Sequence, residues 1–274
     1  METILITGLD GSGKSTIFNA LSMVQGGIGF NLIYLPTIDT ESLKEDSKLK
    51  KTAEFVNQLN QLADEQQLPS LKAIAIFSAM LLFKKIHDYK TKPGIQIIFC
   101  ERHPLIDTQV YAQFYAEKAG SGSQSLTSFS KMDEKFNEEL EYLVQQIPEN
   151  FAMDKKASIG WLATFIFKRF FVEKKLALSD LKELFGIGLP HKIYYLKAKA
   201  DILVQRIANR EIHEAHETIE VLAKLGLGYD RLLMDLGISY PNLIEIIDAG
   251  RLQDLDKFKV RLLQKYSNSP SGKP

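Results

Sequence analysis

The sequence predicts an α/β fold in which helices cover both faces of a five-stranded parallel sheet. Short apolar runs, each bounded by glycine, proline or charge, give the candidate strands Thr3–Thr7, Asn31–Leu35, Ile95–Cys100, Lys192–Leu196 and Leu243–Ile247. These runs are almost continuously apolar, as expected for strands that are covered on both faces. Helical segments separate them, which favours parallel pairing through crossover connections and a three-layer arrangement.

Length and composition limit the class of protein. The chain has 274 residues, enough for one large α/β domain or one domain with an insertion. Lys plus Arg equals Asp plus Glu at 34 each, which argues against nucleic acid as a partner and makes any anion site local. The single cysteine, Cys100, cannot form an internal disulfide, so we expect a reducing, cytoplasmic setting. We expect no membrane association and no signal or transit peptide, because no apolar stretch is long enough to span a bilayer and the first strand starts near residue 3.

We expect a single domain over residues 1–266. Ser47–Gln67 and Ser70–Tyr89 predict two long helices, separated near Pro69. The second helix is apolar on all sides between Ala73 and Phe83, which is typical of a core helix.

A helical insertion is expected at about 120–186, ahead of the fourth strand. Residues 119–131 are rich in Gly, Ser and Thr and predict a flexible loop. Asp133–Gln146 predicts one amphipathic helix, and Trp161–Val172 predicts a second, apolar one. The Ser/Pro/Gly/Lys composition of residues 267–274 predicts a disordered tail.

The stretch Gly8-Leu9-Asp10-Gly11-Ser12-Gly13-Lys14-Ser15-Thr16 fits the phosphate-loop pattern, and it lies between a predicted strand and a predicted helix. Glycines let backbone N–H groups turn toward phosphate oxygens, and the helix N-terminus adds a positive dipole end. Lys14 would reach the terminal phosphates as a catalytic group, and the Ser15 hydroxyl would bind Mg²⁺. The candidate ATP-binding residues of this loop are Gly8, Gly11, Ser12, Gly13, Lys14, Ser15 and Thr16.

Two charged residues follow the third predicted strand. Glu101 is placed to hold Mg²⁺, directly or through water, because ligands in open α/β sheets bind outside the carboxyl ends of the strands. Arg102 is placed to clamp a phosphoryl oxygen of the acceptor or of the transferred group. The alternative is a solvated ion pair at the end of a strand.

Later segments add further candidates. Arg206 and Arg210 lie four residues apart on a predicted helix that begins near Asp201, in a lid of about residues 201–217, and so share one face. They would neutralise charge on the moving phosphoryl group, or they belong to a charged surface helix. Ala249 lies in the loop after the fifth strand and would flank a nucleotide base, unless this is an ordinary turn.

The ordered set of motifs resembles the thymidylate kinase and deoxynucleoside kinase group of P-loop kinases, from residue 3 to about 262. The resemblance implies a P-loop NTPase fold, ATP and Mg²⁺ as cofactors, a nucleotide or nucleoside as acceptor and a homodimer. It also implies acceptor binding through Asp10 at the sugar, Phe77 against the base, and Arg102 and Tyr111. Ala249 matches the loop that abuts adenine in this group, and Glu101-Arg102-His103 matches its acidic-Arg motif.

The sequence departs from the family pattern at two functional positions. Leu35 stands where a carboxylate usually precedes the proline after strand two, and in deoxynucleoside kinases that carboxylate is the general base. Asp39 or Glu41 could replace it from the following loop. Leu81 stands where a thymine-reading arginine is expected. The insertion at about 120–186 also has no counterpart in the family, and would reshape the acceptor pocket or bind a partner.

The sequence therefore predicts transfer of the ATP γ-phosphoryl group to a nucleoside monophosphate. A deoxynucleoside kinase is one alternative. The others are a P-loop NTPase switch, although the guanine-reading pattern Asn-Lys-X-Asp is absent from the sequence, and a nucleotide-binding scaffold that has lost catalysis.

Overall fold

The computed structural model describes residues 1–25, 29–121, 129–208 and 218–267. The chain gathers into two compact units that are each built from separate stretches of sequence. Unit one comprises Met1–Ile33, Lys90–Arg102 and Pro190–Pro274, and unit two comprises Tyr34–Tyr89 and His103–Leu189. Each unit is described by itself below.

Unit one contains the whole sheet. Its strands are β1 (Glu2–Gly8), β2 (Phe30–Ile33), β3 (Ile97–Cys100), β4 (Lys192–Lys197) and β5 (Ile244–Asp248). They form one parallel sheet in the order β2-β3-β1-β4-β5, which confirms the five predicted strands. β3 begins two residues later than expected, because the N–H of Ile95 closes a turn onto the carbonyl of Lys92 at 3.0 Å instead of joining the ladder.

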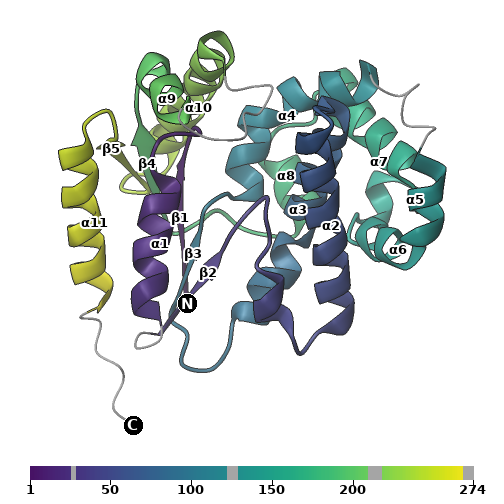
Figure 1. The fold of residues 1–274 in the computed structure, drawn as a ribbon, viewed down its shortest axis with the longest axis horizontal. Helices are drawn as coiled ribbons and strands as arrows, with labels where there is room; N and C mark the ends of the chain where they lie inside the picture. The colour runs from purple at the N-terminus through teal and green to yellow at the C-terminus, as the bar shows by residue number, and fades with distance from the viewer. Residues whose placement is uncertain (26–28, 122–128, 209–217, 268–274) are drawn as a thin grey trace. The chain divides into compact units, whose positions relative to one another are not determined.

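The described residues of unit one form the helices α1 (Lys14–Val24), α9 (Ala200–Ile207), α10 (Ile219–Ser239) and α11 (Leu252–Ser267). Tyr194 of β4 packs on Phe258 of α11, with ring centroids 5.0 Å apart, and Tyr195 stacks on Tyr229 of α10 at 5.3 Å. Successive strand residues point to opposite faces. Helices α10 and α11 therefore cover opposite faces of the sheet, with α1 beside α11 (Figure 1). This confirms the predicted three-layer α/β fold.

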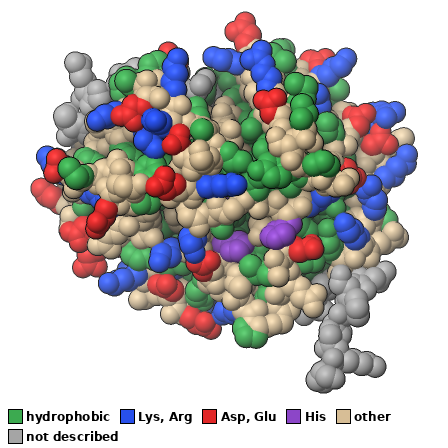
Figure 2. Space-filling model, turned by 180° about the vertical axis from the view of Figure 1, so that it is seen from behind, with side chains coloured by type: hydrophobic (Ala, Val, Ile, Leu, Met, Phe, Trp, Pro, Cys, Tyr) green, Lys and Arg blue, Asp and Glu red, His purple; other side chains and the backbone are tan. Residues whose placement is uncertain are grey.

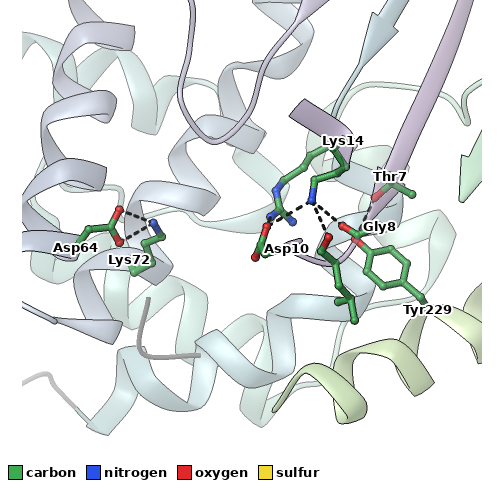
Figure 3. A network of polar contacts seen from close by, with 9 residues as sticks. Thr7, Gly8, Asp10, Lys14, Asp64, Lys72 and Tyr229 are labelled. Carbon is green, nitrogen blue, oxygen red and sulfur yellow. Dashed lines mark hydrogen bonds and ion pairs between the residues drawn. The ribbon is translucent and has the colours of Figure 1, made fainter. Parts of the chain in front are cut away.

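Within its described residues, unit two has helices as its regular secondary structure and no strand. Its elements are η2 (Thr40–Leu43), α2 (Ser47–Glu65), α3 (Pro69–Lys90), α4 (Pro104–Ser121), α5 (Ser130–Lys135), α6 (Asn137–Gln145), η4 (Glu149–Phe151), α7 (Ile159–Ile166), η5 (Phe167–Val172) and α8 (Leu178–Phe185). The two predicted long helices are confirmed as α2 and α3. Pro69 is the first residue of α3, where a missing N–H costs nothing. Lys72 of α3 binds Asp64 of α2 at 2.7 Å and ties the two helices together (Figure 3).

The predicted helix Asp133–Gln146 is wrong in one respect, because the structure has two helices there. The chain leaves helical geometry at Phe136, with φ −116° and ψ 32°, between α5 and α6. The ring of Phe136 packs on Phe55 of α2 at a centroid distance of 4.7 Å. The break between α5 and α6 therefore coincides with the packing of Phe136 on α2, and the amphipathic pattern of the sequence does not predict it.

The rest of the predicted insertion packs inside unit two. The apolar helix expected over Trp161–Val172 is α7 followed by a π-helical turn, η5. Both contact α4, while α6 contacts α2. The predicted loop is narrower than expected, since α4 extends to Ser121 and α5 begins at Ser130. Residues 122–128 of the loop and 268–274 of the predicted tail lie outside the described residues.

Candidate active site

The phosphate loop lies between the end of β1 at Gly8 and the start of α1 at Lys14. Gly11 and Gly13 have φ values of 81° and 97°, which side chains rarely adopt. A Cβ atom on Gly13 would also lie 2.4 Å from Cδ2 of Leu255, so a larger residue there would force the Leu255 side chain to move. Gly13 is the N-cap of α1 and supplies no side-chain cap, which leaves the first N–H groups of the helix available to an anion.

Lys14 is folded into the loop. Its Nζ donates to the carbonyl oxygens of Gly8 at 2.9 Å and Leu9 at 3.1 Å, and it lies 3.4 Å from Oδ1 of Asp10 (Figure 3). Lys14 is only 4% exposed. A buried ammonium group needs such partners, and phosphate oxygens are acceptors that can replace them.

Ser12 supplies a buried hydroxyl group with spare capacity. Its Oγ has no hydrogen-bond partner among the described residues, and the side chain is fully buried. Its N–H closes a turn onto the carbonyl of Leu9 at 3.1 Å. Leaving a buried donor unsatisfied typically costs about 1–3 kcal/mol, which a phosphate oxygen at this position would relieve. The loop therefore fits the phosphates of ATP.

Arg102 reaches the same loop from the neighbouring strand. The parallel register of β1 and β3, with Leu5 opposite Cys100, brings the end of β3 beside the loop. Nη2 of Arg102 lies 3.4 Å from Oδ1 of Asp10, the same oxygen that faces Lys14. The side chains of Arg102 and Asp10 are 11% and 16% exposed. The structure therefore brings Asp10, Lys14 and Arg102 together, although Arg102 is far from the other two in the sequence and each of the three has a different predicted role.

The two predicted metal ligands are oxygen donors of the kind that Mg²⁺ prefers. Ser15 is exposed in the first turn of α1. Glu101 directly follows β3, where its N–H binds the carbonyl of Ile33 at 3.1 Å. Mg²⁺ usually takes only one or two carboxylates and keeps waters or substrate phosphates as its other ligands. The described residues contain no cluster of three or more His, Cys, Asp or Glu side chains that could hold a metal.

Arg206 is near the loop but does not face it as an open cation. Its guanidinium donates to the carbonyl oxygens of Gly11, Ala249 and Gly250. Ala249 is fully buried, and its N–H binds the carbonyl of Lys197 at 2.8 Å. Arg210 lies outside the described residues.

Phe77 and Tyr111, which the resemblance assigns to acceptor binding, belong to unit two. Phe77 is 5% exposed. Its ring packs against Phe165, Phe170 and Phe185, at centroid distances of 5.8, 5.7 and 6.2 Å. Tyr111 is 4% exposed and stacks on Tyr115. This packing serves the core of unit two, and acceptor binding by Phe77 and Tyr111 stays a prediction.

The departures from the family pattern are core residues, since Leu35 and Leu81 are 1% and 4% exposed. Both proposed replacements for the missing general base, Asp39 and Glu41, are exposed. The hydrogen bond from Lys50, together with the charges of Lys50 and Lys44, lowers the pKa of Glu41. A carboxylate with a lowered pKa is a weaker base, so Glu41 is poorly suited to activate a hydroxyl.

One supporting contact has no signal in the sequence. The hydroxyl of Tyr229 on α10 lies 3.1 Å from Oγ1 of Thr7, and both residues are fully buried (Figure 3). Thr7 is the last residue before the phosphate loop. Tyr229 occupies an apolar position in the buried stripe of α10, so periodicity alone marks it only as core.

Charge on the surface does not add a second anion site on the face drawn in Figure 2. Lys and Arg side chains are interspersed there with Asp and Glu. This agrees with the balanced composition of the chain. Among the described helices, none combines the length and the apolar character needed to cross a membrane.

Comparisons with known proteins give structural resemblances only. No family model matches the chain, and no curated protein matches it. Among solved structures, it is similar to deoxyadenosine kinase from M. mycoides with bound dATP, at 15% identity and a TM-score of 0.48, covering 98% of this chain and 100% of that chain. The same kinase with dCMP and dCDP is similar at 15% identity and a TM-score of 0.45, with the same coverage. Thymidylate kinase from Candida albicans is similar at 16% identity and a TM-score of 0.47, covering 97% of this chain and 92% of that chain.

Proposed function

We propose that this protein is a nucleotide kinase that transfers the γ-phosphoryl group of ATP to a nucleoside monophosphate. The observation that carries the proposal is the phosphate loop, where a buried Lys14 is held by exchangeable acceptors beside the unpaired hydroxyl of Ser12. This loop follows a parallel strand and opens into a helix N-terminus without a side-chain cap. Such a site binds a polyphosphate and favours charge that develops on its terminal group.

The charged residues around the loop divide the work of transfer. Lys14 would exchange its loop carbonyls for phosphate oxygens and stabilise the spread of negative charge in the transition state. Arg102 would hold the acceptor phosphate, and Asp10, whose Oδ1 faces both cations, would hold Lys14 and Arg102 in orientation. The bond between the β,γ-bridging oxygen and the γ-phosphorus breaks as an acceptor phosphate oxygen bonds to that phosphorus, and ADP leaves.

Ser15 and Glu101 are the residues that would hold Mg²⁺. When bound, Mg²⁺ supplies positive charge against the β- and γ-phosphate oxygens. Ser15 offers a neutral hydroxyl oxygen from α1, and Glu101 offers a carboxylate from the end of β3. This division lets one ligand be removed by mutation without disturbing the loop itself.

A phosphate acceptor suits this chain better than a sugar hydroxyl. A hydroxyl nucleophile needs a general base, but the buried Leu35 occupies the family position for it, so the base would have to come from Asp39 or Glu41 in the following loop. The phosphate of a nucleoside monophosphate is already an anion at neutral pH. We therefore place a deoxynucleoside kinase second to a monophosphate kinase.

A substrate-dependent assay of ADP release separates the remaining possibilities. ADP that appears only with a nucleoside monophosphate supports the proposal, and release only with a nucleoside supports a deoxynucleoside kinase. Slow release without any acceptor would indicate an NTPase switch, and no release would indicate a scaffold. Because Leu81 offers a base no hydrogen-bond donor, preference among pyrimidine monophosphates should stay within about 10–200-fold, the range of an apolar wall.

A further inference from the structure

The guanidinium of Arg206 joins two loops that are far apart in the sequence. Nη1 donates to the carbonyl oxygens of Gly11 at 3.3 Å and Ala249 at 2.7 Å, and Nη2 donates to that of Gly250 at 3.1 Å. Gly11 lies in the phosphate loop, and Ala249 and Gly250 follow β5. Its hydrogen-bond partners in the described part of the chain are thus all backbone carbonyls.

The helix that carries Arg206 rests directly on the phosphate loop. A Cβ atom on Gly11 would lie 2.9 Å from the carbonyl oxygen of Leu203 and 3.2 Å from Cγ1 of Ile207. Leu203 and Ile207 are each only 1% exposed, so α9 is packed firmly at this point. On its other side the loop is closed by the hydrogen bond from Ser12 N–H to Leu9. Helix α9 and the phosphate loop are therefore in close contact through their backbones, and Arg206 adds hydrogen bonds to this contact.

The geometry needs an arginine. A guanidinium group presents five N–H donors in one rigid plane, so it can span acceptors on separate loops. An ammonium group is a compact point charge on a flexible stem and cannot hold the same set of acceptors at once. The two loops also lie close to α9, because a Cβ atom on Gly250 would be in van der Waals contact with Cδ1 of Ile202 at 3.6 Å.

We propose that Arg206 is a positioning residue of the donor site. It holds the phosphate loop and the loop at 249–250 in a fixed mutual arrangement, so that the phosphate end and the nucleoside end of the donor are bound together. It does this through backbone carbonyls and not by touching the transferred phosphoryl group. The inference rests on the proposed function, because it takes this loop to be the donor site.

ADP is the ligand that tests the inference, because it lacks the transferred phosphoryl group. Arg206→Ala should raise the dissociation constant of ADP by about 10–100-fold, since charge-assisted hydrogen bonds that shape the site are lost. The kcat at saturating ATP should fall by no more than about tenfold, since no transition-state contact is removed. Arg206→Lys keeps the charge but loses the planar fork, and should recover only part of the ADP affinity.

A matched control removes another arginine of unit one. Arg261 of α11 is 57% exposed and pairs with Glu245 of β5, away from the phosphate loop. Arg261→Ala should leave the ADP dissociation constant within about twofold of wild type, as for a surface substitution. Circular dichroism and thermal melting without nucleotide check that every variant is folded. If Arg206→Ala does not fold, the ADP affinity of Arg206→Lys tests the positioning role instead.

The outcomes separate this inference from the proposed function. A folded Arg206→Ala chain that binds ADP normally but turns over about 10²-fold more slowly would make Arg206 a catalytic residue and overturn the inference. Full recovery of ADP affinity by Arg206→Lys would overturn it too, since charge alone would then suffice. If wild-type protein fails to bind ADP at all, the proposed function itself fails.

Discussion

Lys14 shows how a residue can be prepared for a ligand by its own backbone. Its Nζ is held by the carbonyls of Gly8 and Leu9, and it faces Asp10 at 3.4 Å. These acceptors keep the ammonium group in the loop at little cost, and phosphate oxygens can take their place. The charge is thus in position before a substrate arrives, which is the arrangement that electrostatic stabilisation of a transition state requires.

Replacing Lys14 with Ala should reduce kcat by on the order of 10²–10³, the usual loss for one preorganised charge or donor. Phosphoryl transfer by the purified variant measures this directly. Lys257→Ala is the matched control, because Lys257 is 77% exposed on α11 and pairs with Asp254 of the same helix. Equal rates for wild type and a folded Lys14→Ala protein would exclude this loop as the catalytic site.

Glu101 is one of the two residues that we propose hold Mg²⁺. Glu101→Gln removes a negative ligand or water anchor at the end of β3 and keeps the size of the side chain. The Mg²⁺ concentration that gives half-maximal activity should rise by about tenfold or more, the usual cost of altering a metal site. A titration with Mg²⁺ at saturating ATP measures the change. If the Mg²⁺ requirement stays at the wild-type value, Glu101 is a structural strand-end residue.

At the scale of single residues, the sequence predicts the parts of the site that are consecutive in the chain or that follow a predicted strand. The phosphate loop could be recognised because its side chains and glycines are consecutive, and Arg102 because it follows a strand that must end at the same edge. The anchoring of Arg206 could not be predicted, because backbone carbonyls such as that of Gly11 carry no residue signature. The contact between Tyr229 and Thr7 could not be predicted either, because it joins positions that are far apart in the chain.

At the scale of elements, helix α4 has an unusual beginning. The N–H of His103 donates to Oδ2 of Asp107 at 2.7 Å, and Nδ1 of His103 accepts from the N–H of Leu105 at 3.3 Å. His103 is fully buried, with its ring against Phe83. Burial, followed by the charge of His87, lowers the pKa of His103 to about 3. The neutral ring thus caps the helix, and protonation of Nδ1 would remove that acceptor.

This cap makes stability depend on pH. Between about pH 6.5 and 3 the unfolded chain binds a proton at residue 103 that the folded chain does not, so the free energy of unfolding rises with pH across this window. Going from pH 7 to 5 should cost the wild type about 2 kcal/mol through this residue alone. Asn can cap a helix without titrating, so His103→Asn should lose less over the same interval. Urea unfolding at the two pH values measures the difference, and parallel losses in both proteins would contradict it.

Element boundaries were predicted well where sequence breaks mark them and poorly where packing sets them. Pro69 separates α2 from α3 as expected, because proline fits the first position of a helix. The break between α5 and α6 at Phe136 has no glycine or proline that would predict it from the sequence. The ring of Phe136 packs on Phe55 instead. The π-helical turn after α7 likewise follows an apolar run that reads as continuous helix.

At the scale of the whole molecule, the three-layer architecture followed from the sequence but the grouping of segments did not. Continuous apolar runs separated by helices require a covered parallel sheet, and unit one has that sheet. The division into two units joins residues 34–89 with 103–189, across β3. Composition does not change at residue 33 or 102, so no linker marks these borders. The extent of the single domain expected over residues 1–266 stays a prediction.

The central claim is that this chain moves the γ-phosphoryl group of ATP to a nucleoside monophosphate. The most direct test follows the label from γ-labelled ATP in the presence of Mg²⁺ and each monophosphate, with wild type and Lys14→Ala side by side. We predict label in a nucleoside diphosphate for the wild type, no label in inorganic phosphate without acceptor, and a product rate reduced on the order of 10²–10³ in the variant. Label that appears only in inorganic phosphate, or that moves equally well with Lys14→Ala, would contradict the account.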